Sequence, residues 1–122
     1  MVTQYTEELV EVCRKAFQRG LVGGSGGNIS VRVPDRDEVL ISATGVCLGD
    51  LSPGTVVRVS LAGQVLEAHA GHRPSKETGF HLAAYRLRPQ VGAVVHLHPP
   101  FATAFAVCGK ELPLVTDGSR LN

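Results

Sequence analysis

The chain has 122 residues, of which 43% are hydrophobic and 19% are charged, and its formal net charge is +1. This length fits one domain, residues 1–122, with a real core, and the composition excludes the low hydrophobicity and high net charge of a disordered chain. The charge balance gives no basis for binding nucleic acid or an anionic membrane, and no apolar run approaches the length of a membrane span.

The three cysteines are widely spaced and never form a C-x-x-C pair: they are Cys13, Cys47 and Cys108. This pattern favours reduced packing residues over a disulfide framework or a cysteine-type zinc site. The first eight residues have neither the basic start nor the apolar run of a signal peptide. We therefore expect a cytoplasmic protein.

The first predicted element is an amphipathic helix. Apolar residues recur at helical spacing from Glu7 to Arg19, Thr6 can cap the start, and Gly20 can sit just past the end. Residues 23–28 follow, and four of these six are glycine, so a regular helix or strand is not expected there.

The middle of the chain has the pattern of β-strands. Apolar and polar residues alternate over 29–33, which predicts a strand with one buried face, and the short turn at 34–37 predicts an antiparallel partner at 38–42. Two further strand-like stretches are 56–61 and 64–67.

The pattern becomes helical again over 75–87, with Ser75 as the expected cap, and the β-branched run 92–97 predicts a buried strand. Two prolines end that strand, and a short helix is expected at 101–108. The elements together predict an α/β fold of three layers with a mixed, largely antiparallel central sheet.

The strongest chemical signal is the pair His96 and His98. Side chains alternate along a strand, so these two imidazoles would point the same way and could share a metal ion. Imidazole suits zinc and similar divalent cations. Two ordinary histidines would produce the same spacing, and a catalytic metal site needs a third protein ligand.

Two other segments allow both a chemical and a structural interpretation. In Ser75-Lys76-Glu77, the carboxylate could transfer a proton, but serine and glutamate are also routine capping residues at a helix start. The glycine loop ending at Asn28 could offer N–H groups to an anion or could simply connect two elements. The loop matches neither a P-loop nor a dinucleotide-binding loop.

His81 and Tyr85 lie four residues apart, on one face of the second predicted helix. We expect them to pack or to support the site.

Four segments, in their order and spacing, resemble the class II aldolase/adducin family. The segments are 26–32, 41–46, 74–77 with His81 and Tyr85, and 93–98. The resemblance covers nearly all of the chain between residues 17 and 107. It implies an α/β/α sandwich with a class II aldolase-like sheet, a divalent cation of the zinc type (Zn²⁺), and a homotetramer with sites shared between subunits.

The resemblance also implies a role for each candidate residue. His96 and His98 would bind the metal, and Glu77 would be the general acid/base. The residues around the substrate phosphate would be Asn28, Thr44, Gly45, Ser75 and Lys76.

The implied activity is that of a metal-dependent carbon–carbon lyase acting on a small phosphorylated sugar or sugar acid through a metal-stabilised enediolate. In the sugar-phosphate aldolases of the family a second serine usually stands where this chain has Lys76. The extra cation suits a substrate with a second anionic group, so decarboxylation of a phosphorylated acid stands slightly ahead of aldol cleavage.

The resemblance further implies that the chain is truncated at its C-terminus and that the missing part supplies a third metal ligand, because no histidine follows His98. Two alternatives stay open for this reason. One is a non-catalytic relative of the adducin kind, in which the fold serves assembly. The other is a module that binds phosphorylated ligands without converting them.

Overall fold

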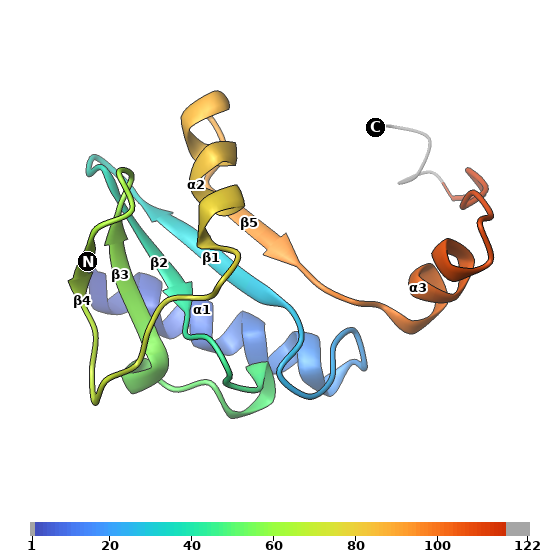
Figure 1. Ribbon diagram of the computed structural model, residues 1–122, viewed down its shortest axis with the longest axis horizontal. Helices are drawn as coiled ribbons and strands as arrows, with labels where there is room; N and C mark the ends of the chain where they lie inside the picture. Colours follow the sequence, from blue (N-terminus) through green and yellow to red (C-terminus); the bar gives the residue numbers. More distant parts are fainter. Residues whose placement is uncertain (1, 117–122) are drawn as a thin grey trace.

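The computed structural model describes residues 2–116. In this part of the chain, helices flank a five-stranded sheet with the order β4-β3-β2-β1-β5 (Figure 1). The helices are α1 (Val2–Gln18), α2 (Thr78–Leu87) and α3 (Pro100–Val107), and the strands are β1 (Asn28–Val33), β2 (Glu38–Ser42), β3 (Val56–Ser60), β4 (Val65–Glu67) and β5 (Ala93–His96). The α/β class and the predicted sheet are confirmed. Among the described strands every pairing is antiparallel, with none of the parallel pairs of a mixed sheet.

Helix α1 is longer than its sequence pattern predicted. It begins at Val2, and Thr6 is an interior residue whose hydroxyl donates to the Val2 carbonyl, so Thr6 is not the cap. The helix extends because Val2 and Tyr5 pack against the core. Its predicted end at Gly20 is confirmed: Gly20 has φ +72°, a value that glycine adopts without steric cost.

The sheet separates two apolar clusters. On one face, α1 residues such as Leu9 and Cys13 pack against Ile29 and Val33 of β1. On the other face, Leu82 and Tyr85 of α2 pack against residues of β2 and β3: Val39, Ile41, Val57 and Val59. This arrangement gives the three layers that the sequence predicted.

Strand β1 differs from the prediction of one buried face, because both of its faces are buried. Ile29 and Val33 face α1, while Asn28 and Ser30 point to the other side and are 6% and 0% exposed under α2. Buried polar groups need hydrogen-bond partners, and these two residues find theirs within the site described below.

Two short 3₁₀ turns, η1 (Leu48–Asp50) and η2 (Pro53–Thr55), join β2 to β3. They bury Leu48 and Leu51 in the cluster under α1. The sequence pattern predicted no helix or strand for residues 48–55.

The helix predicted at 75–87 begins later in the structure. Helix α2 starts at Thr78, and Ser75 lies in the preceding turn, where its hydroxyl accepts the Glu77 N–H at 3.2 Å. Strand β5 then runs along β1 at the edge of the sheet. Helix α3 projects from the main body (Figure 1), and its residues Phe101, Phe105 and Val107 are exposed.

All three cysteines are free thiols, as predicted, but only Cys13 is fully buried. Cys108 is exposed at the end of α3 and is therefore not a packing residue. Between residues 2 and 116, no helix combines the length and hydropathy needed to cross a membrane.

Candidate metal and phosphate site

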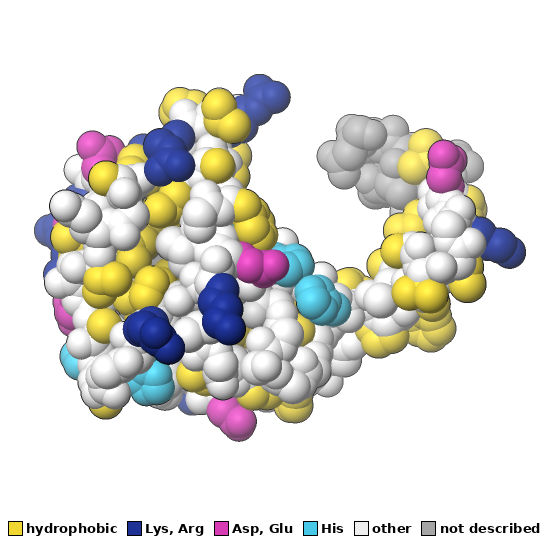
Figure 2. Space-filling model, viewed as in Figure 1, with side chains coloured by type: hydrophobic (Ala, Val, Ile, Leu, Met, Phe, Trp, Pro, Cys, Tyr) yellow, Lys and Arg dark blue, Asp and Glu magenta, His cyan; other side chains and the backbone are white. Residues whose placement is uncertain are grey.

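One cavity of about 360 Å³ brings the eight predicted site residues together. It is lined by residues 25–28, 43–45 and 75–77 together with His96 and His98. These segments come from the glycine loop before β1, the end of β2, the turn before α2 and the end of β5. The space-filling view shows acidic and histidine side chains next to one another, beside the hollow between the main body and the α3 arm (Figure 2).

The two histidines of the cavity point toward one another. His96 is the last residue of β5, His98 lies two residues further on, and their Nε2 atoms are 3.1 Å apart. The backbone N–H of His98 donates to the Leu21 carbonyl, which ties this segment to the end of α1. Gly27 makes room for this histidine segment, because a Cβ on residue 27 would lie 2.9 Å from the His96 carbonyl oxygen. Gly27 also has a φ of +74°, which favours glycine.

Glu77 lies beside the first histidine. Its Oε2 is 2.7 Å from His96 Nδ1, so the Nδ1–H can donate to the carboxylate and leave Nε2 with a free lone pair. Glu77 stands at the N-cap position of α2, yet its side chain makes no capping hydrogen bond. The capping interpretation therefore does not explain this carboxylate.

Asn28 contacts the same carboxylate oxygen of Glu77 as His96 does. Its Nδ2–H donates to Glu77 Oε2 over 2.6 Å. This hydrogen bond is the largest cause that lowers the pKa of Glu77 below its usual value, and it outweighs burial, which would raise that pKa. The carboxylate is thus held in its ionised form next to an imidazole.

The predicted phosphate-binding residues line the same cavity. An antiparallel bridge joins Ala43 to Pro74, so the Thr44 N–H donates to the Arg73 carbonyl and the Ser75 N–H donates to the Ser42 carbonyl. These two backbone donors are therefore already used. An anion bound there would depend on the hydroxyls of Thr44 and Ser75 and on the Lys76 ammonium group.

Ser30, which was not among the predicted site residues, connects the site to α2. Its hydroxyl lies 2.7 Å from His81 Nδ1 and 2.7 Å from the Tyr85 hydroxyl. Burial lowers the pKa of His81 to about 4, so this imidazole is neutral at neutral pH. The available signal was the alternation along β1, which puts Ser30 on the same side as Asn28.

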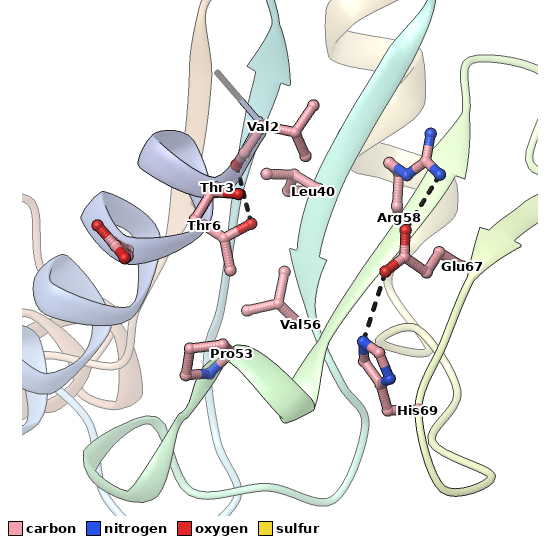
Figure 3. A pocket seen from close by; sticks show the side chains of 10 residues that line it. Val2, Thr3, Thr6, Leu40, Pro53, Val56, Arg58, Glu67 and His69 are labelled. Atoms are coloured by element: carbon pink, nitrogen blue, oxygen red, sulfur yellow. Dashed lines mark hydrogen bonds and ion pairs between the residues drawn. The ribbon is translucent and has the colours of Figure 1, made fainter.

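A second cavity of about 360 Å³ lies between α1 and β2–β4 (Figure 3). Three of its charged or titratable side chains are in contact: Glu67 lies 3.1 Å from Arg58 and 3.4 Å from His69, and Arg58 also binds Glu38 outside the cavity at 3.0 Å. This cavity does not contain the histidine pair or Glu77, so the first cavity is the better candidate for chemistry.

A family model described as "Class II Aldolase and Adducin N-terminal domain" matches residues 7–121. The chain therefore belongs to the class II aldolase and adducin family. Of the similar proteins, 3-oxo-tetronate 4-phosphate decarboxylase of Escherichia coli strain K12 is 44% identical over 82% of this chain and 45% of its own length. L-fuculose phosphate aldolase of Methanococcus vannielii is 37% identical over 94% of this chain and 60% of its own length.

The fold agrees with this membership. The solved structure of L-fuculose 1-phosphate aldolase from Glaciozyma antarctica PI12 matches with a TM-score of 0.83 and 27% identity, over 95% of this chain and 48% of that one. The chain spans about half the length of the curated relatives it matches.

Proposed function

We propose that the protein carrying this chain is a metal-dependent carbon–carbon lyase that acts on a small phosphorylated sugar or sugar acid. The observation that carries the proposal is that three side chains meet in one cavity. The Nε2 atoms of His96 and His98 are adjacent, and the Glu77 carboxylate contacts Nδ1 of His96. The similar proteins are named as aldolases and decarboxylases of phosphorylated compounds, which supports the same class of reaction.

The histidine pair fits a divalent cation of the zinc type. Two nitrogens bound to one tetrahedral zinc at about 2.0–2.1 Å lie roughly 3.3 Å apart, close to the 3.1 Å between the Nε2 atoms of His96 and His98. The contact of His96 Nδ1 with Glu77 would fix the ring with Nε2 available. When bound, such a cation would polarise a carbonyl oxygen and stabilise negative charge that develops there.

Glu77 would then transfer the proton. It is held ionised by Asn28, and 46% of its side chain is exposed, so a substrate can reach it. In aldol cleavage the carboxylate would accept the proton of a substrate hydroxyl and return it to the carbon at which the C–C bond breaks; in decarboxylation it would pass a proton from water to the carbon that loses CO₂.

The phosphate group would bind to the remaining donors that line the cavity. The hydroxyls of Thr44 and Ser75, the backbone of Gly45, the second amide hydrogen of Asn28 and the Lys76 ammonium group are the available donors. A phosphate held there would keep the reacting carbons between these donors and the histidine pair.

Lys76 favours a substrate with two anionic groups, and we place phospho-acid decarboxylation ahead of aldol cleavage for this reason. The ammonium group is exposed on the cavity wall next to Glu77. It could neutralise a carboxylate that a neutral sugar phosphate lacks.

One observation keeps a second candidate function open. Within residues 2–116, no cluster of three or more His, Cys, Asp or Glu side chains is arranged to hold a metal. A relative that binds phosphorylated ligands without converting them, or one of the adducin kind, would also fit this finding.

The test is a metal and activity measurement on the full-length protein. We expect stoichiometric zinc and release of CO₂ from 3-oxo-tetronate 4-phosphate, lost with a chelator and restored by Zn²⁺. A panel of sugar phosphates, assayed for aldehyde release, would separate aldol cleavage from decarboxylation. Full activity in chelated protein would contradict the metal proposal, and no metal and no turnover would favour the second candidate. Light scattering of the same sample would test the homotetramer that we propose on family resemblance.

A further inference from the structure

A buried row of hydrogen bonds runs from the candidate site into the layer between β1 and α2. Asn28 Oδ1 lies 2.5 Å from His81 Nε2, and His81 Nδ1 lies 2.7 Å from the Ser30 hydroxyl, which in turn contacts the Tyr85 hydroxyl at 2.7 Å. All four residues are at most 6% exposed. The row begins at Glu77, which accepts from Asn28 Nδ2.

The direction of each hydrogen bond follows from the amide of Asn28. Its Nδ2–H donates to Glu77 Oε2 over 2.6 Å, so the Asn28 oxygen faces His81. An amide oxygen can only accept, so His81 must carry its proton on Nε2. The bare Nδ1 then accepts from the Ser30 hydroxyl, and that hydroxyl accepts from Tyr85.

We propose that His81 is a positioning residue. By donating from Nε2 it fixes the orientation of the Asn28 amide, and through this amide it sets the position of the Glu77 carboxylate. A flipped amide would turn its oxygen toward Glu77, and two acceptors would face each other at hydrogen-bond distance. His81 opposes this flip, because its Nε2–H would then face the NH₂ group of the amide; the Ser30 and Tyr85 hydroxyls, which can each donate or accept, do not oppose it by themselves.

The sequence supports the arrangement at two levels. Asn28 and Ser30 are alternate residues of β1 and share the face that α2 covers, and His81 and Tyr85 are four residues apart on α2 and share the face that it presents to β1. A purely apolar layer would have packed the same volume without polar groups. The polar row instead connects the buried face of α2 to the carboxylate of Glu77, the residue at the start of the same helix.

The first experiment determines the tautomer of His81 in the full-length protein. Long-range ¹H–¹⁵N correlation of the labelled imidazoles shows which ring nitrogen carries the proton. We expect His81 to be protonated on Nε2 and bare on Nδ1 at neutral pH. A proton on Nδ1, or on both nitrogens, would overturn the proposal. This measurement does not need turnover, so it is decisive even if the proposed lyase function fails.

The second experiment, which rests on the proposed function, separates positioning from stability. We expect His81→Leu to lower kcat about tenfold to a hundredfold while KM changes by less than about threefold. In His81→Gln the amide nitrogen can replace the Nε2 donor, and we expect kcat to return to within about threefold of the unmodified protein. Val57→Ala is the matched control, because it removes buried atoms from the same layer but none of the hydrogen-bonding groups of the row.

The outcomes of the second experiment are distinct. Unchanged kcat in His81→Leu would overturn the proposal, and so would an equal loss of kcat in Val57→Ala at the same loss of melting temperature. If His81→Leu does not fold, His81→Gln and the tautomer measurement on the unmodified protein still decide it. The Asn28 side-chain amide signals, which should shift in His81→Leu and not in Val57→Ala, provide a further readout independent of activity.

Discussion

Asn28 and His96 are direct cross-strand partners, although 68 residues separate them in the chain. Residues that are paired in an antiparallel ladder project their side chains to the same face. The amide and the imidazole therefore approach Glu77 together, at 2.6 Å and 2.7 Å from its Oε2 atom. The register of β1 against β5 is thus what brings the carboxylate to the histidine pair, and a slip of one residue would separate them.

Glu77→Gln should abolish turnover while leaving metal binding and stability nearly intact. The amide keeps the shape but cannot take up a proton, and the expected loss of kcat is about a hundredfold or more. Stability should change by only a few tenths of a kcal/mol, because the turn before α2 is held by Ser75 and Thr78 rather than by the Glu77 side chain. Steady-state rates, zinc content and melting temperature of the full-length protein would check this. Full activity of the variant would remove Glu77 from the mechanism.

His98→Ala should weaken zinc binding by about a hundredfold or more, because a ligand is lost rather than displaced. His69→Ala is the matched control: His69 lies in the second cavity and contacts Glu67. A competition titration with a chromophoric chelator measures both. Equal affinities in the two variants would show that the histidine pair does not bind the metal.

Lys76→Ser should change which substrate is preferred. Removing the ammonium group should reduce kcat/KM for a phosphorylated oxo-acid by about tenfold or more, because a substrate carboxylate loses its counter-charge. The effect on a neutral sugar phosphate should be smaller. Lys76→Met retains most of the side-chain length without the charge and should behave like Lys76→Ser. Equal losses for both substrate classes would show that Lys76 does not select a second anionic group.

Acid should destabilise the protein through His81. Its pKa of about 4 in the folded state lies below the usual 6.5, so the unfolded chain binds more protons between these pH values and stability falls as the pH is lowered through this window. The expected loss is about 3 kcal/mol from pH 6.5 to pH 4. Urea unfolding at several pH values would measure it. In His81→Gln this part of the pH dependence should vanish, and an unchanged slope would contradict the assignment to His81.

The strand pattern and the helical spacing were sufficient to predict the layers, because each reports which face of an element is apolar. The start of α1 was missed since its first turn is stabilised by packing of Val2 and Tyr5, which local caps do not reveal. Pairing of His96 with His98 followed from strand alternation alone. The contact of Asn28 with Glu77 did not, because it depends on where the turn before α2 lies against the sheet.

The burial of Ser30 could not be predicted from the sequence either. A serine that alternates with apolar residues of a strand normally indicates a solvent-facing position, and only the covering helix α2 turns it into a buried one. His81 and Tyr85 were recognised as sharing a helix face, but the sequence does not say what that face meets.

The strand order also affects the order in which the strands pair during folding. Strands β1 to β4 follow one another along the chain and lie side by side, so they can form by successive local pairings, whereas β5 must return past α2 to reach the free edge of β1. The ladder that aligns Asn28 with His96 is therefore the latest to close and the first to open. Hydrogen exchange should find the amides of β5 less protected than those of β2, and an added cation that binds the histidines should slow exchange most strongly in β5. The pairing of β5 with β1 therefore also brings the parts of the candidate site together.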